Sequence, residues 1–229
     1  MKKISKYDIS TSSLDLFNKD FLKVLTKEYK AIKRLKKSIE TDPEIVGNIH
    51  KVFEAFRLAY TNNNRVFFSG IGKNEPIAKK IASTFASLSL PAFYFDSVSA
   101  IHGDLGMVSD NDIIIYLSRS GKTEEIIRTM RYIYDMNKKG EDFKNIIQIG
   151  LDCNNEDSNF SAFCNISIHL YLREEADYLD LAPSASSTLL LAFGDALGIT
   201  FAKMVGIDKE IFHLNHPGGS LGKMLEKGY

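Results

Sequence analysis

The spacing of apolar positions changes along the chain, from a helical repeat in the first sixty residues to short apolar runs afterwards. Leucine, isoleucine, valine and phenylalanine recur every three or four residues between about 12 and 60. The segment Asp42-Pro43-Glu44 interrupts this repeat in the manner of a helix start. We therefore predict two helices before the first strand, as an N-terminal helical extension over residues 1–60. Because this extension is long, we expect it to be packed, either against its own domain or against another subunit.

Five short runs rich in β-branched and aromatic residues follow, separated by segments with a helical pattern. The strands are predicted at 65–70, 92–95, 113–117, 145–150 and 166–170, and the main helices at 77–88, 123–138 and 184–205. This alternation predicts a doubly wound α/β domain, with a five-stranded parallel sheet flanked by helices. We expect residues 61–229 to form this domain as one compact unit. Ligands of such sheets bind beyond the carboxyl ends of the strands.

Composition and charge narrow the range of partners. The chain holds 29 basic and 29 acidic side chains, so no net field attracts nucleic acid or an anionic membrane. The lysine-rich segment 27–37 is expected to be a solvated helix face. No apolar run approaches roughly eighteen residues, and no apolar segment follows the N-terminal lysines, so neither a membrane span nor a signal peptide is expected. Cys153 and Cys164 lack metal-site spacing and are expected to be reduced thiols of a cytoplasmic protein.

The most informative stretch for function is Ser118-Arg-Ser-Gly-Lys-Thr123, between the third predicted strand and its helix. The first N–H groups of a helix have no intrahelical acceptor, and the helix dipole makes this end attractive to anions. Ser118, Ser120 and Thr123 add hydroxyl donors, and Gly121 lets the backbone approach a phosphate closely. The segment therefore favours phosphate binding, although an ordinary helix start capped by Thr123 would have a similar composition.

Two more loops are expected at the same edge of the sheet. Gly72 and Lys73 follow the first strand in a tight turn, which matches neither a dinucleotide fingerprint nor a Walker A loop. The lysine could neutralise a phosphate or support a carbonyl oxygen, or it could be a solvated turn residue. His102 lies between two glycines after the second strand, where it could contact a ligand or hold the loop by hydrogen bonds.

The remaining candidate site residues are two glutamates, a second hydroxyl-rich helix start and a histidine. Glu175 follows the fifth strand, and Glu125 opens the helix after the phosphate-binding candidate. If such a carboxyl is shielded from solvent, its pKa rises toward the range useful for proton abstraction, and the glutamate could act as a catalytic base. Alternatively, each glutamate could be a solvated residue in the first turn of a helix, without a catalytic role. Residues 184–188 include four hydroxyls, Ser187 among them, which is more than capping requires. His216 lies in a His-Pro-Gly-Gly segment, whose bent backbone would hold the ring rigidly.

Together these segments resemble the sugar isomerase (SIS) domain, a phosphosugar-binding α/β fold. They are most similar to the arabinose 5-phosphate isomerases of the 3-deoxy-D-manno-octulosonate (Kdo) pathway. The similarity covers roughly residues 65–225, in the order of the family, and its segments are Ser-Gly-Ile-Gly-Lys73, His102-Gly-Asp-Leu-Gly-Met-Val108, Ser118-Arg-Ser-Gly-Lys-Thr123, Leu181-Ala-Pro183, Gly194-Asp-Ala-Leu197 and His216-Pro-Gly-Gly219. The His-Gly-Asp-Leu-Gly and His-Pro-Gly-Gly segments distinguish this branch from other SIS domains.

The resemblance implies interconversion of ribulose 5-phosphate and arabinose 5-phosphate through a cis-enediol, for the synthesis of a Kdo-type sugar of lipopolysaccharide or capsule. The positions that match the family's catalytic residues are Lys73, Glu125, Glu175 and His216. The positions implied for substrate binding are Gly72, His102, Ser118, Ser120, Gly121, Thr123 and Ser187. The resemblance also implies a homotetramer with sites at subunit interfaces, where His216 could serve a neighbour's site. No metal or organic cofactor is implied.

The chain departs from the family pattern in ways that bear on substrate identity. Its 229 residues hold no counterpart of the paired cystathionine-β-synthase-type (CBS) regulatory domains of longer members, so a short form is expected. Arg119 stands where a small polar residue is usual, and it could add a phosphate contact or face solvent. Asp180 stands where the family usually has glycine. Asp177 and Asp180 add negative charge near the site. Two alternatives therefore remain open, an isomerase of another phosphosugar and a non-catalytic phosphosugar sensor.

Overall fold

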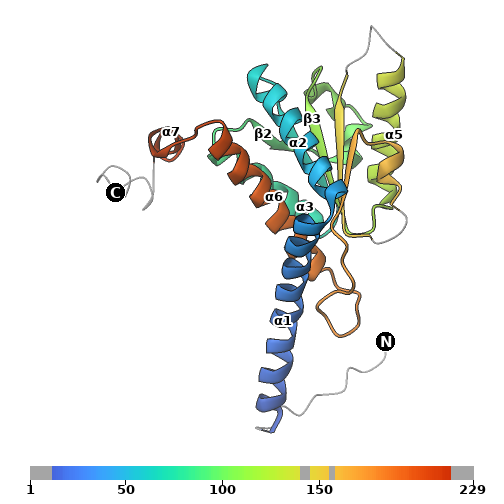
Figure 1. Cartoon of the computed structure of the whole chain (residues 1–229). Helices are drawn as coiled ribbons and strands as arrows, with labels where there is room; N and C mark the ends of the chain where they lie inside the picture. The colour runs from blue at the N-terminus through green and yellow to red at the C-terminus, as the bar shows by residue number, and fades with distance from the viewer. Residues whose placement is uncertain (1–11, 140–144, 155–157, 218–229) are drawn as a thin grey trace.

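Five parallel strands form one sheet with helices on both faces (Figure 1). The architecture comes from a computed structural model of the chain, which describes residues 12–139, 145–154 and 158–217. The strand order is β2-β1-β3-β4-β5, and every neighbouring pair is parallel. The strands are β1 (Val66–Gly70), β2 (Ala92–Tyr94), β3 (Ile113–Ser118), β4 (Ile147–Asp152) and β5 (Ile166–His169). The predicted doubly wound sheet is confirmed.

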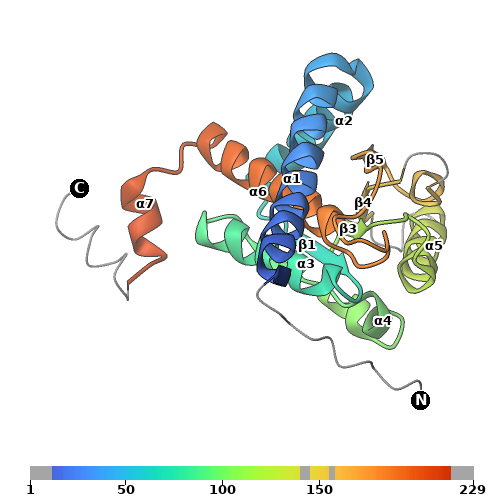
Figure 2. The ribbon, with the colours of Figure 1, turned by 90° about the horizontal axis from the view of Figure 1, so that it is seen from below.

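Most of the helices divide into two layers, one on each face of the sheet (Figure 2). The α-helices are α1 (Ser12–Thr41), α2 (Pro43–Thr61), α3 (Asn74–Ser87), α4 (Ser97–Ala100), α5 (Glu124–Lys138), α6 (Ala185–Met204) and α7 (Lys209–Leu214). Two 3₁₀ turns, η1 (Asp104–Met107) and η2 (Phe160–Ala162), complete the described elements. One core layer joins α1, α2, α3 and α6 to the sheet, and the other joins α4 and α5.

The central strands are buried on both faces, which explains their uninterrupted apolar runs. In β1, Phe68 lies in the core under α2, α3 and α6, and Phe67 lies in the core on the α5 side. In β3, Ile115 and Tyr116 divide between the two layers in the same way. Side chains of a strand alternate between faces, so a strand with a core on both sides needs apolar residues at every position.

The two N-terminal helices pack differently. Helix α2 begins at Pro43 after the predicted break, and the Asp42 carboxylate accepts the N–H of Glu44 over 2.9 Å. Its Phe56 lies in the core, with ring centroids 5.5 Å from those of both Phe85 and Phe201. The division of the chain at residue 60 stays a prediction, with α2 packed against the sheet.

Helix α1 is half packed and half projecting. Ala31 and Leu35 are buried against the domain, whereas the N-terminal half reaches beyond it at the bottom of Figure 1. There Phe17, Phe21 and Leu22 are each more than half exposed, at 63%, 56% and 61%. The apolar face of α1 therefore continues past the part that its own domain covers.

Helices α3 and α6 approach closely because α6 carries glycine where they meet. A Cβ at Gly198 would lie 2.6 Å from the Phe85 ring, and one at Gly194 would collide with Ile81. Within the described residues, α6 is also the single helix long and apolar enough to cross a membrane, and 56% of it is buried inside the fold, as in the core helix of a globular domain.

A helix start and a short helix illustrate where the structure differs from the expectation. Helix α3 begins at Asn74 rather than near residue 77, because Pro76 sits in the first turn, where a missing N–H costs no hydrogen bond. Helix α7 was not predicted. It has six residues, too few to show a periodic pattern, and begins where the Asp208 carboxylate accepts the N–H of Ile211 over 2.9 Å.

Candidate functional site

The predicted phosphate loop, residues 118–123, lies at the carboxyl edge of the sheet, between β3 and α5. Ser118 is buried, and its Oγ accepts the N–H of Gly121 over 3.0 Å and bonds with Thr123 Oγ1 over 3.0 Å. Ser120 Oγ accepts the N–H of Lys122 over 3.1 Å. Gly121 has φ +62°, and a Cβ there would collide with Ser158, so this turn requires glycine. The loop is braced by its own hydroxyls.

The start of α5 meets the main requirement of an anion site. Thr123 occupies the N-cap position, but within the described structure its side chain makes no hydrogen bond to the N–H groups of the helix. Its hydroxyl bonds with Ser118 instead, so the predicted alternative of capping by the Thr123 side chain is wrong. Helix α5 has 15 residues, and the positive end of its dipole faces the loop.

A polar pocket of about 190 Å³ adjoins this loop. The residues that line it are Arg119, Ser120, Cys153, Asn154, Leu172 and Arg173. Asn154 follows β4 and donates from Nδ2 to the carbonyl of Ser120 over 2.9 Å, which joins the two sides of the pocket. Cys153 is 3% exposed, and burial raises the pKa of its thiol, so it is protonated and unreactive near neutral pH. The pocket therefore offers hydrogen bonds and positive charge beside the phosphate loop.

Glu175 is completely buried, and both of its carboxylate oxygens are occupied. Oε2 accepts the N–H groups of Ser184 and Ser186, over 2.9 and 3.1 Å, at the start of α6. Oε1 accepts Nε of Arg119 over 2.7 Å. Burial alone would raise the pKa of Glu175, but the hydrogen bonds from Ser186 and Ser184 and the charge of Arg119 hold it below its ordinary value. The expected upward shift is therefore wrong for Glu175.

The second hydroxyl-rich helix start is consequently occupied by a carboxylate of the chain itself. Glu175 accepts the N–H groups of Ser184 and Ser186 at the start of α6, which would otherwise lack an intrahelical acceptor. Ser187 lies in the first turn of α6 with a hydroxyl that has no hydrogen-bond partner among the described residues. The Ser186 hydroxyl next to it has none either, so two buried hydroxyls of this turn have no hydrogen-bond partner among the described residues.

Three of the predicted site residues are exposed at the carboxyl edge. Lys73 follows β1 at the N-cap of α3, after Gly72 with φ +63°. His102 lies in the turn after α4, and its backbone N–H donates to the carbonyl of Ser99 over 2.9 Å. Glu125 lies in the first turn of α5, directly after the phosphate loop. Their exposure leaves an ammonium, an imidazole and a carboxylate free to meet a ligand.

His216 is not brought to this edge within one chain. Its Nδ1 lies 2.8 Å from the carbonyl oxygen of Phe212, on whose ring it stacks at 4.0 Å. The neighbouring Asn215 donates to the Ser89 hydroxyl, beyond the C-terminal end of α3. Because α3 runs from the carboxyl edge to the amino edge, the contact of Asn215 with Ser89 places His216 at the end of the domain opposite the phosphate loop. Figure 1 shows α7, which precedes His216, standing apart from the sheet.

Sequence reasoning missed two cations that hold the loop before α6. Arg119 was noted only as a departure from the family pattern, yet it pairs with the buried Glu175. Lys27 of α1 was expected to be solvated, but its Nζ lies 2.8 Å from Glu174 Oε2 and donates to the carbonyl of Glu175 over 3.2 Å. The unusual identity of residue 119 was the available signal for the first contact. The second joins residues 148 positions apart, which no local pattern reveals.

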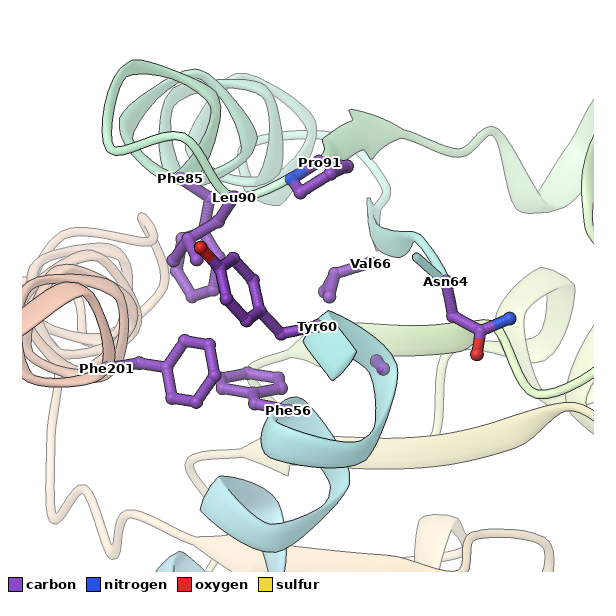
Figure 3. Close-up of a pocket in the computed structure, with 9 residues that line it drawn as sticks. Phe56, Tyr60, Asn64, Val66, Phe85, Leu90, Pro91 and Phe201 are labelled. Carbon is purple, nitrogen blue, oxygen red and sulfur yellow. The ribbon is translucent and has the colours of Figure 1, made fainter. Parts of the chain in front are cut away.

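The pocket at the amino edge of the sheet is less suited to a polar ligand. An apolar pocket at the amino edge lies between α2, α3 and α6, and Figure 3 shows the rings of Phe56, Tyr60 and Phe201 turned toward one another there. Its volume of about 10 Å³ corresponds to about one water molecule. Across residues 12–139, 145–154 and 158–217, no three His, Cys, Asp or Glu side chains form a group that could hold a metal ion.

Comparison with known proteins assigns the family. Residues 59–200, more than half of the chain, match the family model of the SIS domain. The chain belongs to the SIS domain family. The phosphate loop and the pocket beside it lie within the matched part of this SIS domain.

Two sequence relatives and one solved structure are similar over most of the SIS chain. It is 35% identical over 199 residues to arabinose 5-phosphate isomerase KdsD of Francisella tularensis, covering 85% of this chain and 58% of the relative. It is 35% identical over 172 residues to KdsD of Pseudomonas aeruginosa, covering 75% and 50%. The chain thus spans about half the length of the relatives that it matches. The E. coli CFT073 protein c3406, solved in complex with arabinose 5-phosphate, superposes with a TM-score of 0.74 at 32% identity, covering 91% of this chain and all of that one.

Proposed function

We propose that the protein is an aldose–ketose isomerase that interconverts D-ribulose 5-phosphate and D-arabinose 5-phosphate, supplying a Kdo-type sugar for lipopolysaccharide or capsule. The observation that carries the proposal is the start of α5, where a hydroxyl-rich loop and a helix end without a side-chain cap from Thr123 adjoin a polar pocket. The similarity to arabinose 5-phosphate isomerases, and to a structure in complex with arabinose 5-phosphate, supports this substrate.

The phosphate of the sugar would bind at the phosphate loop. The N–H groups at the start of α5, with the hydroxyls of Ser120 and Thr123, provide donors for its oxygens. Gly121 keeps the backbone in the left-handed conformation that the turn needs. This anchoring would leave the carbonyl end of the sugar to reach the exposed groups along the same edge.

We infer that Glu125 is the base that acts on carbon. A base removes a proton from C1 of the ketose to give a cis-enediol, and the proton returns at C2 to give the aldose. Glu125 is exposed beside the phosphate loop, whereas both carboxylate oxygens of Glu175 are occupied. The Lys73 ammonium would stabilise the enediolate oxygen, and His102 would line the site. Glu175 then acts by holding the neighbouring loops.

The position of His216 supports an assembly in which subunits share sites. Helix α6 separates Glu175 from α7, and its 20 residues span about 30 Å. His216 therefore reaches a site by contact with a second copy of the chain, where it would move the hydroxyl proton or help to open the sugar ring. The projecting apolar half of α1 supports the same arrangement, which we propose to be a homotetramer.

The expected compartment follows from the proposed substrate and from cysteine chemistry. Cys153 and Cys164 are both free thiols, as is usual for a protein of a reducing compartment. We propose a cytoplasmic enzyme whose SIS domain, residues 61–229, follows the helical segment 1–60. No metal or organic cofactor is needed for the proton transfers proposed, because every step uses side chains of the chain itself.

The test compares two neighbouring carboxylates in one assay. Glu124 and Glu125 both lie in the first turn of α5 and both are exposed, so Glu124→Gln is a matched control for Glu125→Gln. We expect Glu125→Gln to lower kcat for the conversion of ribulose 5-phosphate by about 10²-fold or more, as loss of a general base does. Glu124→Gln should stay within a few-fold of the natural protein. Near-normal turnover by Glu125→Gln would refute this choice of base.

A further inference from the structure

Two positions at which the chain departs from the family pattern contact the same buried residue, Glu175. Arg119 Nε donates to Glu175 Oε1 over 2.7 Å, and its Nη2 lies 3.8 Å from Asp180 Oδ1. The same oxygen of Asp180 accepts the backbone N–H of Glu175 over 2.5 Å. The two departures are therefore not independent, because their side chains meet around one residue.

The backbone of Asp180 is unfavourable for any residue except glycine. Its φ is +55°, in the left-handed region that glycine adopts readily and an L-residue adopts only at a cost in free energy, which is smaller for aspartate. Glycine would avoid this cost but would supply no carboxylate. The contacts of Asp180 with Arg119 and with the Glu175 N–H give a physical reason for an aspartate here.

Through Glu175 these contacts join two loops that the sheet alone does not connect. Arg119 lies in the phosphate loop, between Ser118 and Ser120, and its carbonyl accepts the N–H of Cys153 over 3.1 Å. The other oxygen of Glu175 holds the N-terminus of α6. The chain of contacts therefore runs from the phosphate loop through a buried carboxylate to the start of α6.

We propose that Arg119, Glu175 and Asp180 form a clamp that fixes the phosphate loop against the loop before α6, and that Arg119 and Asp180 are positioning residues of the site. The inference rests on the proposed function in one respect, because its effect on catalysis is measured with ribulose 5-phosphate. It assigns Arg119 to the carboxylates rather than to the substrate phosphate, because the guanidinium already pairs with Glu175 and contacts Asp180. A carboxylate as buried as Glu175 needs this cation nearby.

The charges of the clamp predict how its residues depend on one another. Without Arg119, the carboxylates of Glu175 and Asp180 would lose the guanidinium that both contact, so their mutual repulsion would no longer be offset and the pKa of Glu175 would rise. Removing Asp180 as well would relieve that repulsion. The ionisable groups near Glu175 in the described part of the chain include Lys27 from α1, Glu174 in the same loop, and Cys153 after β4. All of these remain in the variants, so they do not account for a difference between them.

The experiment uses Arg119→Asn, Asp180→Gly and the double variant in the full chain, with Arg128→Asn, an exposed arginine on α5, as the charge control. The first readout is the titration of the Glu175 carboxyl by ¹³C NMR, assigned with Glu175→Gln. The second is the pH profile of kcat/KM with ribulose 5-phosphate. Arg119→Asn should move the titration and the acidic limb to higher pH and lower kcat/KM by about tenfold or more. The double variant should recover most of both changes.

Three outcomes decide between the clamp and its alternatives. A Glu175 carboxyl that titrates alike in the natural protein and in Arg119→Asn would overturn the clamp, and so would a double variant whose losses simply multiply. If Arg119→Asn fails to fold, Arg119→Lys keeps the charge but cannot donate from Nε, and should titrate nearly normally with reduced kcat/KM. A natural protein that does not isomerise the sugar would refute the proposed function, while the carboxyl titration would still test the clamp.

Discussion

The two glutamates assigned to the site illustrate how surroundings decide the role of a residue. Glu125 and Glu175 both follow strands at the carboxyl edge, so the sequence pattern treats them alike. The structure separates them, because one carboxylate is exposed and the other is buried with both oxygens occupied. The partners come from residues 119, 184 and 186, distant enough in sequence that no spacing predicts them.

A second buried carboxylate provides a test of pH dependence. Asp152 is buried at the end of β4, and His169 Nδ1 on β5 lies 3.0 Å from its oxygens. This hydrogen bond raises the pKa of His169 above its ordinary value of 6.5, against the opposing effect of burial. The pair therefore stabilises the fold fully below about pH 6.5 and progressively less as pH rises through the raised pKa.

We expect His169→Gln to lower the melting temperature more on the acidic side of this range than on the alkaline side. Thermal unfolding across the range, followed by circular dichroism, measures the difference. His50→Gln is the control, because His50 is exposed on α2. An equal loss of melting temperature at every pH would show that the ion pair does not act as described.

At the scale of elements, apolar periodicity predicted the sheet and the long helices but not the short ones. The five strands and α5 lie close to their expected ranges, because burial on both faces imposes continuous apolar runs and one-sided burial imposes a helical repeat. Helices α4 and α7 have four and six residues, so neither presents a repeat. The clamp around Glu175 was also beyond prediction, because it joins loops whose approach depends on the packed sheet.

The contact between α3 and α6 gives a prediction about packing. Gly194→Ala places a methyl group against Ile81, so we expect the free energy of unfolding to fall by about 1–3 kcal/mol. Gly47→Ala on α2 is the matched control. A Cβ there meets nothing within 4 Å, so this variant should gain about 0.4–1 kcal/mol from helix propensity and chain entropy. Urea denaturation measures both, and equal effects of the two substitutions would contradict the close packing.

The whole molecule has two features that a single copy leaves incomplete. Half of α1 projects with its apolar face uncovered by the described part of its own chain, and His216 lies at the end opposite the phosphate loop. The sequence pattern indicated that the leader would pack and that the histidine would be held rigidly. The sequence pattern did not predict how far the projecting half of α1 and His216 lie from the site, because that depends on the direction of α6 across the sheet.

Shared sites predict complementation between inactive variants. Glu125→Gln and His216→Ala remove groups that we assign to different subunits of one site. Unfolding and refolding the two variants together should therefore restore turnover above that of either alone, because some interfaces would combine an intact Glu125 with an intact His216. Each variant refolded separately is the control. A refolded mixture no more active than the separate proteins, although mixed oligomers form, would place both groups in one subunit.

We propose that the carboxyl edge of this SIS domain carries out proton transfer between the two carbons of an enediol. The reaction of ribulose 5-phosphate in D₂O, followed by NMR, tests this proton transfer. We expect arabinose 5-phosphate with deuterium at C2 and ribulose 5-phosphate with deuterium at C1, both lost in Glu125→Gln. Binding of ribulose 5-phosphate without exchange or product would contradict it, and would favour a sensor or an isomerase of a different sugar phosphate.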